Sequence, residues 1–261
     1  MEKIRIKNQF ILSPFFLDEP VSGLETLAKP GWIINKPSLP NSDKQTRIAA
    51  VDRRIAQIVA GTISAGKRPV SIAGDCVSAI GVLAGLQYAE INPFLIWFDA
   101  HGDFNTWETT PSGFLGGMPL AMIVGRGEQT IAKAVGLKPF PETQIILTDA
   151  RDLDAGERLS LQKSAIIHFN NPNSVAGYAL PDMPLYIHID TDIIAPDEAP
   201  AMNYPAPGGL SVAELKYIFD KLAEKGRIVA VSLSSWNPEL DQSKSSEKVC
   251  MDLLESLIGG D

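Results

Sequence analysis

The sequence predicts an α/β fold in which a parallel sheet is covered by helices on both faces. Short apolar runs typical of buried strands alternate with helical patterns of ten or more residues. Strands joined by such helices are linked by right-handed crossovers, so neighbouring strands are expected to be parallel. A chain of 261 residues, 45% of them apolar, supplies enough side chains for one large core. No repeat, low-complexity tract or long linker interrupts it, and we expect a single domain spanning residues 1–261.

Each predicted strand is a short apolar run bounded by turn-forming or charged residues. These runs cover residues 68–73, 93–98, 143–147, 185–189 and 227–233. Continuous apolar runs of this length are typical of strands buried on both faces of a parallel sheet.

Three helices are predicted from apolar residues that recur at helical spacing. The clearest spans residues 43–65, with Asn41 or Ser42 placed to cap it. Its apolar positions are Ile48, Val51, Ile55, Ile58, Val59 and Ile63. A second helix starts at Ser211, and a third covers residues 246–258 after the final strand.

Charge and cysteine content exclude several classes of partner. The 23 basic and 31 acidic residues give a net charge of −8 with no basic run, which argues against nucleic-acid and membrane-surface binding. Asn8 and Pro14 break the N-terminal apolar run, so no signal peptide is expected, and no stretch reaches the roughly 18 apolar residues of a spanning helix. Two cysteines cannot form a dense disulfide framework. We therefore expect a cytoplasmic protein.

Polar side chains follow four of the five predicted strands, at the point where each strand ends. The segments are 74–76, 99–103, 190–192 and 234–238. Ligands of open parallel sheets bind at the carboxyl ends of the strands, where these segments meet. This edge of the sheet is therefore the candidate functional site.

The array Asp99, His101 and Asp103 indicates a metal site. Extended backbone would place these three side chains on one side, and their carboxylates would repel each other without a cation between them. Asp190 and Asp192 would add oxygens from a neighbouring strand, and carboxylates with one imidazole suit Mn²⁺. This many carboxylates is compatible with two metals about 3.5–4 Å apart that activate a water molecule.

The alternative is that these side chains are structural. A lone Asp-x-Asp at a strand end is more often a turn or a helix cap, but two such arrays after separate strands favour a metal. For His168 and His188 we expect a hydrogen-bonded histidine at the edge of the core. Cys76 taken alone would be a small buried apolar residue.

Together these segments resemble the arginase family of ureohydrolases, which includes arginase, agmatinase and formimidoylglutamase. The similar segments, within about residues 71–241, are 73–76 (AGDC), 98–106 (FDAHGDFNT), 112–119 (SGFLGGMP), 151–154 (RDLD), 189–192 (IDTD), 207–210 (PGGL) and 237–238 (NP). The resemblance implies a three-layer α/β/α fold and a binuclear manganese centre. It also implies that a metal-bound hydroxide attacks the guanidinium or amidine carbon of the substrate, so that a C–N bond is cleaved. A homo-oligomer, commonly a trimer or hexamer, is implied as well.

The resemblance also implies a role for each matching residue. Asp99 and Asp190 would bridge both metals, His101 and Asp192 would complete the second site, and Cys76 and Asp103 would belong to the first. Asp103 would also be catalytic, because it would hold the hydroxide toward the substrate carbon. The positions that contact the substrate's amino-acid end in arginase are here Asn105, Ser112 and Asp154.

Three residues depart from the family's pattern. Cys76 stands where the family normally has histidine, and a thiolate ligand is tolerated by zinc, iron or cobalt as well. Ser235 takes the substrate-binding position where arginase and agmatinase carry a glutamate that pairs with the guanidinium, and Gly116 replaces a histidine of arginase. We expect arginine and agmatine to be poor substrates, with a pocket rebuilt around Trp107, Tyr204 and Trp236.

Two functions of different class follow from this pattern. The first is a metal-dependent hydrolase that acts on a small molecule. The second is a non-catalytic relative that keeps the fold and a single metal as a structural or binding module. The intact ligands of the second site favour a bound ion under either hypothesis.

Overall fold

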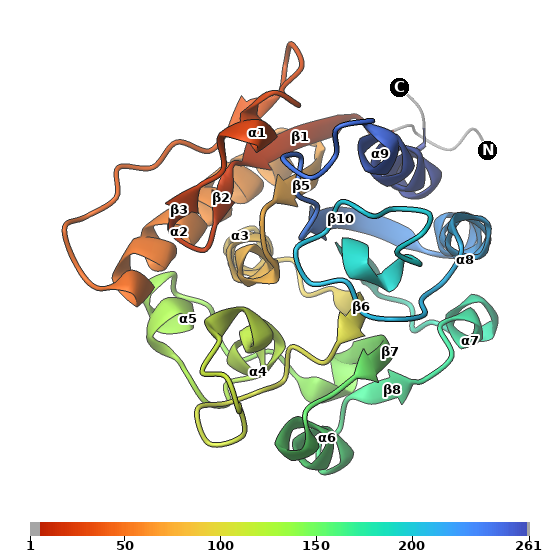
Figure 1. The fold of residues 1–261 in the computed structure, drawn as a ribbon. Helices are drawn as coiled ribbons and strands as arrows, with labels where there is room; N and C mark the ends of the chain where they lie inside the picture. Colours follow the sequence, from red (N-terminus) through yellow and green to blue (C-terminus); the bar gives the residue numbers. More distant parts are fainter. Residues whose placement is uncertain (1–5, 260–261) are drawn as a thin grey trace.

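A computed structural model describes residues 6–259, and at its centre is an eight-stranded sheet with the order β4-β1-β5-β10-β9-β6-β7-β8 (Figure 1). Its strands are β1 (Asn8–Ser13), β4 (Ile33–Ile34), β5 (Arg68–Ala73), β6 (Phe94–His101), β7 (Ile145–Asp152), β8 (Ile167–Phe169), β9 (Pro184–Asp190) and β10 (Arg227–Ser234). Every strand pair in this sheet is parallel, which confirms the prediction. The ends of the predicted domain, 1–5 and 260–261, lie outside the described residues.

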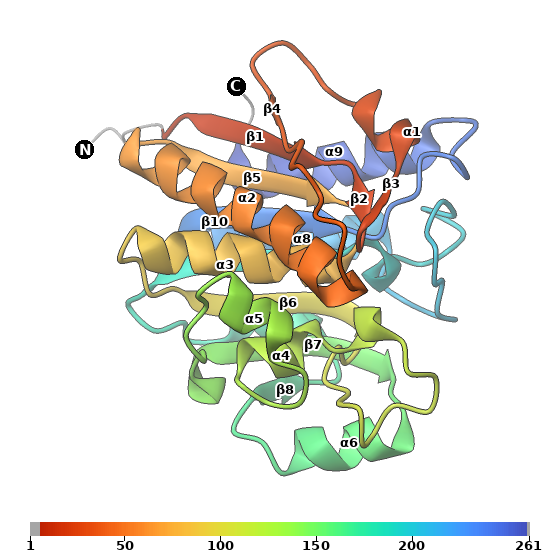
Figure 2. The same ribbon diagram turned by 90° about the vertical axis from the view of Figure 1, so that its left-hand side faces the viewer.

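Helices cover both faces of the sheet, so the predicted three-layer fold is confirmed. One face carries α2 (Lys44–Ser64), α3 (Ala79–Tyr88), α4 (Pro119–Ile123), α5 (Thr130–Ala134) and α6 (Ala155–Gln162), most of them in front in Figure 2. The other carries α7 (Asn173–Gly177), α8 (Val212–Lys225) and α9 (Ser245–Ile258). Each face has its own apolar core. None of the described helices is long and apolar enough to cross a membrane.

Short elements complete the edges of the fold. The first turn of helix is α1 (Ser22–Glu25), next to an antiparallel hairpin of β2 (Phe15–Phe16) and β3 (Glu19–Pro20). Four 3₁₀ turns, η1 (Cys76–Ser78), η2 (Leu115–Gly117), η3 (Glu142–Gln144) and η4 (Thr191–Ile193), follow or precede strands and helices. Two of them, η1 and η4, begin where β5 and β9 end, at the predicted site.

The predicted elements are confirmed, with corrections at two strand ends and one helix cap. Strand β6 continues through Asp99 to His101, and β7 continues to Asp152, both beyond their predicted ends. Strand β5 has the predicted limits, and Ser211 caps α8 by accepting the backbone N–H of Glu214. The cap of α2, however, is Asp43 and neither Asn41 nor Ser42. The Asp43 carboxylate accepts the backbone N–H of Thr46 at 2.9 Å, and a carboxylate at this position also favours the positive end of the helix.

Helices α2 and α3 pack unusually closely beneath the predicted site. A Cβ atom on Gly81 would lie 2.7 Å from the carbonyl oxygen of Asp52, so only glycine permits this approach. The close contact buries the Asp52 side chain between the two helices. It also fixes the start of α3, which directly follows Cys76 and η1.

Candidate metal centre

The carboxyl ends of β5, β6, β9 and β10 surround a cavity of about 190 Å³. Nine of the ten predicted site residues line it: Cys76, His101, Asp103, Asn105, Ser112, Asp154, Asp190, Asp192 and Ser235. The tenth, Asp99, is buried close to them. The fold thus brings together residues that are far apart in the sequence, as predicted from the strand ends.

Asp99, His101 and Asp192 form one candidate ligand group, which we call the second-site group. His101 Nδ1 lies 2.8 Å from Asp192 Oδ2 and 3.6 Å from Asp99 Oδ1. The carboxylates are also held by backbone donors, since the N–H of Ala100 bonds Asp192 and that of His101 bonds Asp99. The geometry of this group is therefore fixed by the protein itself.

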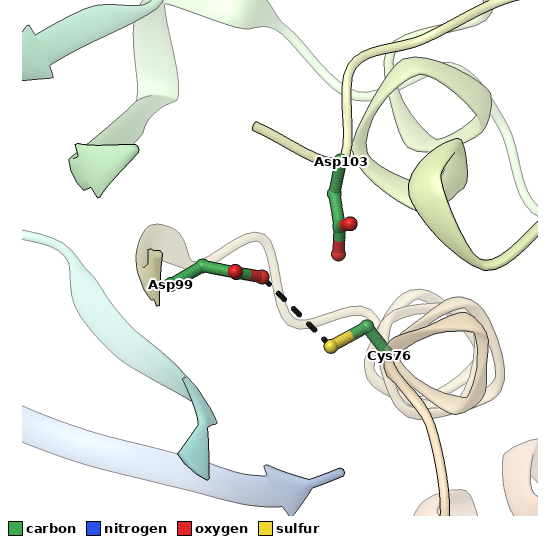
Figure 3. A group of neighbouring side chains, drawn as sticks. All are labelled: Cys76, Asp99 and Asp103. Carbon is green, nitrogen blue, oxygen red and sulfur yellow. Dashed lines mark hydrogen bonds between the residues drawn. The ribbon is translucent and has the colours of Figure 1, made fainter. Parts of the chain in front are cut away.

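Cys76, Asp99 and Asp103 form the other candidate group, the first-site group (Figure 3). Cys76 Sγ lies 3.9 Å from Asp99 Oδ2, which also accepts a hydrogen bond from the Trp97 indole at 3.0 Å. Asp103 Oδ2 is buried and has no hydrogen-bond partner. Asp99 belongs to both groups, as the predicted bridging role requires.

Asp190 lies beside the first-site group, and both of its carboxylate oxygens accept hydrogen bonds from other protein groups. Its Oδ2 accepts hydrogen bonds from the Cys76 thiol, at 2.8 Å, and from the Ser235 hydroxyl. Its Oδ1 accepts the backbone N–H of Asp192 at 2.9 Å. Asp190 thus contacts Cys76 but belongs to neither ligand group. Its bridging role therefore stays a prediction.

Two residues at the cavity have left-handed backbone conformations. The φ angles are +51° at Asp103 and +66° at Ser235, a region that residues other than glycine rarely adopt. The Asp103 carbonyl accepts the backbone N–H groups of Leu120 and Ala121 at the start of α4, which holds it in place. Such conformations cluster at functional sites, where surrounding structure fixes a side chain in a required direction. Period-two geometry therefore does not place Asp103, whose strand ends at His101.

Burial raises the pKa of the carboxylates around the cavity. It raises the pKa of Asp190 to about 7, with a further contribution from Asp192, and that of Asp103 well above its usual value, with contributions from Asp99 and Asp190. For His101, burial opposes the charge, but hydrogen bonds to Asp192 and Asp99 outweigh it and raise its pKa to about 12. The raised pKa values indicate that one imidazole does not balance the negative charge that these acids would carry when all are ionised.

These residues fit divalent metal ions. Each group brings its ligand atoms within 4.8 Å of one another, and buried carboxylates are stabilised by a cation placed between them. The unpartnered Asp103 Oδ2 is the kind of buried acceptor that a metal ion or a water molecule satisfies. The second-site group offers hard oxygens and an imidazole, whereas the first-site group replaces the imidazole by a thiol.

The four predicted substrate-binding residues, Asn105, Ser112, Asp154 and Ser235, all line the cavity. The Asn105 amide donates to Asp154 at 2.9 Å, and its oxygen accepts from Thr109. Ser112 is exposed and bonds the backbone N–H of Phe114 at 3.2 Å. Asn105 and Asp154 are therefore paired with each other, while Ser112 lies nearer the entrance.

Glu157 is a cavity residue that the sequence interpretation missed. Its carboxylate accepts the backbone N–H groups of Phe104 and Asp154, which ties the segment after β6 to the start of α6. Burial raises its pKa to about 7. The signal was present, because Asp154 and Glu157 have the spacing of a capping box, and the structure contains that box.

The predicted aromatic lining is corrected at two of three positions. Tyr204 lines the cavity, but Trp107 points to solvent and bonds Glu128, and Trp236 is buried against Asp241 outside the cavity. The aromatic side chains that join Tyr204 in the lining are Phe16 and Phe114. The sequence held no local signal for them, because their position depends on loops that meet only in the folded chain.

The two remaining histidines are structural, as predicted. His188 is fully buried, its Nδ1 lies 2.7 Å from the Ser232 hydroxyl, and burial lowers its pKa to about 3. His168 Nε2 lies 3.0 Å from the carbonyl oxygen of Asp149. Both described cysteines are free and buried.

Comparison with known proteins gives a consistent result. A sequence model of the arginase family matches residues 35–259, which extends beyond the segments that carried the resemblance. The chain is 31% identical to the arginase of Bacillus subtilis over 241 residues, covering 87% of this chain and 81% of that one. It is 27% identical to the N(omega)-hydroxy-L-arginine amidinohydrolase of Streptomyces lavendulae, with 85% and 81% covered. The crystal structure of Bacillus cereus arginase superposes with a TM-score of 0.83 at 27% identity, covering 98% of this chain and 99% of that one.

Proposed function

The chain belongs to the arginase family of hydrolases, and we propose that it cleaves a C–N bond of a linear guanidino or amidino compound. The observation that carries this proposal is the arrangement of two ligand groups that share Asp99 at one cavity. Relatives named for arginine and for N(omega)-hydroxy-L-arginine support a guanidino-type substrate.

We propose that divalent metal ions are held by the two ligand groups, with manganese the ion that the second-site group favours. Carboxylate and imidazole ligands suit Mn²⁺, and the family resemblance agrees with it. In the first-site group the Cys76 thiolate would favour zinc, iron or cobalt. Bound there, such ions would neutralise the carboxylates and lower the pKa of a water molecule.

The residues of the chain would orient that water and the substrate. Asp103 Oδ2 has no partner of its own, so it can accept a hydrogen bond from the attacking water and hold a lone pair toward the substrate carbon. The water oxygen then bonds to the guanidinium carbon, and the C–N bond to the tail breaks. The tail nitrogen takes the two protons of the water and leaves as a protonated amine, and the remainder is urea from a guanidino compound or an amide from an amidino compound.

The substrate pocket is expected to discriminate against arginine and agmatine. Ser235 supplies a hydroxyl where those enzymes carry a carboxylate, and this hydroxyl already donates to Asp190. A guanidinium would therefore lack one charge-assisted hydrogen bond of about 1.5–3 kcal/mol. The pocket lining differs as well, because Phe16, Phe114 and Tyr204 occupy one wall.

A non-catalytic, single-metal module is the second candidate function. It is favoured by the hydrogen bonds that Asp190 accepts from Cys76 and Ser235 at Oδ2 and from the backbone of Asp192 at Oδ1, which engage both oxygens within the protein. Under this hypothesis only the second-site group would bind an ion, and Asp103 would be a buried acid without a reaction partner.

A screen of substrates and metals tests the proposal. Protein loaded separately with Mn²⁺, Zn²⁺, Fe²⁺ or Co²⁺ is assayed with guanidines, amidines and small amides, and urea, ammonia and amine release are measured. Hydrolysis with at least one metal, lost in Asp99→Asn, is the expected result. The absence of turnover with every metal, together with one ion bound per chain, would favour the non-catalytic module.

We further propose a cytoplasmic homo-oligomer, a trimer or a hexamer, that acts on a small molecule and binds neither nucleic acid nor membranes. The two free, buried cysteines support a reducing compartment, and the net charge of −8 disfavours phosphate surfaces. Light scattering of the purified protein is expected to give three or six times the mass of one chain. A monomeric mass would contradict the assembly without affecting the proposed reaction.

A further inference from the structure

Three aromatic side chains from three distant segments meet at the wall of the cavity. The Phe114 and Tyr204 ring centroids are 5.2 Å apart, and Phe16 lies 6.3 Å from each of them. Phe16 comes from β2, Phe114 from the segment before η2, and Tyr204 from the loop between β9 and α8. We call these three residues the aromatic wall.

Two members of the wall, Phe16 and Tyr204, are anchored through neighbouring residues. The N–H of Leu17, next to Phe16, donates to the buried carboxylate of Asp75. Arg151 bonds the carbonyl oxygens of Ala206 and Pro207, shortly after Tyr204. These charge-assisted bonds hold the segments of Phe16 and Tyr204 in place relative to the metal ligands.

Gly116 makes room for Phe114. A Cβ atom at Gly116 would lie 2.4 Å from two atoms of the Phe114 ring, so the ring occupies the space of the side chain that Gly116 lacks. Gly116, which departs from the family's pattern, therefore provides the space that the Phe114 ring needs in the wall.

The wall also separates two cavities. Phe16 and Tyr204 line both the cavity of the metal ligands and a second one of about 330 Å³, which extends to Val21, Leu24 and Trp236. A substrate tail that lies along the wall is therefore stopped by these rings before it reaches the second cavity.

The charges around the first cavity disfavour an anionic tail. No lysine or arginine side chain lines it in the described part of the chain, whereas Asp152 and Asp154 face its outer part. The Asn105 amide, a donor that a substrate carboxylate would need, already donates to Asp154. A tail carboxylate would lie near these two acids without a cation to balance it.

We propose that the aromatic wall selects guanidino or amidino cations whose tail is apolar, carries no carboxylate and has limited length. This inference rests on the proposed function and names the substrate class for the same site. The tail gains by burying methylene groups against the rings, and each added methylene is expected to improve binding about fourfold until the tail reaches the wall's end.

The test compares two series of compounds on the metal-loaded protein. Linear alkylguanidines from methyl to octyl are matched with guanidinoalkanoic acids of equal chain length. Both kcat/KM and the calorimetric Kd are measured. The alkyl series is expected to improve by about fourfold per methylene up to a maximum and then decline, and to exceed the acid series at every length.

Variants of the wall assign this preference to its residues. Tyr204→Ala and Phe16→Ala should move the maximum to longer tails, because both open the second cavity. Gly116→Ala should weaken the length dependence by displacing the Phe114 ring, and it should add little in a Phe114→Ala background. Trp107→Ala is the matched control, since this exposed indole lies outside the cavity lining and should leave the profile unchanged.

Failure of the aromatic wall can be distinguished from failure of the proposed function. Equal or better use of the acid series, or a length profile that Tyr204→Ala and Phe16→Ala leave unmoved, would overturn the aromatic wall while leaving the hydrolase intact. Absence of turnover with all compounds would overturn the proposed function. In that case the Kd series still tests the wall, because a flat Kd profile contradicts it and a fourfold gradient per methylene supports it.

Discussion

The two ligand groups meet at Asp99, yet the protein stabilises them in different ways. In the second-site group, His101 lies between two carboxylates and backbone N–H groups hold both of them. In the first-site group, Cys76 Sγ contacts Asp99, Asp190 and the hydroxyls of Ser234 and Ser235, and one oxygen of Asp103 has no partner. Burial, followed by Asp190, Asp103 and Asp99, raises the pKa of the Cys76 thiol well above its usual value.

The number of ligands therefore does not by itself determine how a site behaves. The second-site group has an internal positive charge that a metal ion would replace. The first-site group has none, so its stability depends on what binds there. Replacing single residues should therefore affect the two groups differently.

Asp103→Asn is expected to give the largest effect. It keeps the size of the side chain and one oxygen but removes the charge that orients the attacking water. Turnover per bound metal ion should fall by about 10²–10⁴-fold. The assay requires a substrate from the screen and metal analysis of the same sample. Unchanged turnover per metal would remove Asp103 from the mechanism and favour the non-catalytic module.

Metal occupancy should be unequal between the two groups. After dialysis against metal-free buffer, we expect the second-site group to keep its ion and the first-site group to lose it, because Cys76 replaces a harder ligand. Cys76→His should raise the manganese retained by about one ion per chain. Two tightly held manganese ions in the unmodified protein would contradict the contrast between the groups.

A spectroscopic measurement assigns the first site directly. In protein loaded with Co²⁺, a thiolate ligand is expected to give a near-ultraviolet charge-transfer band that is lost in Cys76→Ser. Ser256→Ala, at a hydroxyl on α9, serves as a control and should keep the band. A spectrum that does not change in Cys76→Ser would show that sulfur does not bind the metal.

Arginine and agmatine should be poor substrates, and the reason lies next to the first-site group. Ser235 donates to Asp190 and offers no carboxylate to the guanidinium. Urea release from either compound should stay below the range of about 1–10³ s⁻¹ that is typical of enzymes. Turnover within that range would mean that another acid, such as Asp154, replaces the missing glutamate.

The smallest expected effect is on the free energy of unfolding. It comes from Asp52, which is buried between α2 and α3. Burial, with a contribution from Asp75, raises the pKa of Asp52 well above its usual value, and Asp52 Oδ2 has no hydrogen-bond partner. The stability that the protonated acid provides is lost as pH rises through the folded-state pKa. Asp52→Asn should therefore stabilise the protein by about 1–3 kcal/mol above that pKa and progressively less toward acid pH.

Urea unfolding at several pH values measures this effect. Asp220→Asn, which changes an exposed carboxylate on α8, is the control and should shift stability little at any pH. A gain from Asp52→Asn that is independent of pH would show that the charge of Asp52 does not cause the effect.

The metal ligands could be predicted from the sequence because they lie at strand ends or just after them. Asp99, His101 and Asp192 lie at ends of strands whose apolar runs are unmistakable, and parallel strands bring such ends together. Strand β1 was missed because its burial comes from pairing with β5, which is 55 or more positions away. The direction of Asp103 depends on a left-handed backbone held by α4, which no local pattern encodes.

The aromatic lining of the cavity was harder to predict than its metal ligands. Trp107 and Trp236 are next to predicted site residues in sequence, but one is exposed and the other packs away from the cavity. Phe16 belongs to a hairpin with no sequence motif of its own, and this hairpin is tied to the site by the bonds from Leu17 to Asp75 and from Gly74 to Phe15. Proximity along the chain is thus a good guide on strands, where the register is fixed, and a poor guide in loops.

The order of strands in the sheet has a consequence for how the chain folds. Strands β9 and β10 come last along the chain but lie between β5 and β6 in the sheet. Cys76, at the end of β5, bonds Asp190, 114 positions further along. Until these late strands insert, β5 and β6 have unpaired inner edges, which are prone to pair with other chains. Folding should therefore be slow, as long-range pairing requires, and the metal ligands can assemble only in its final step.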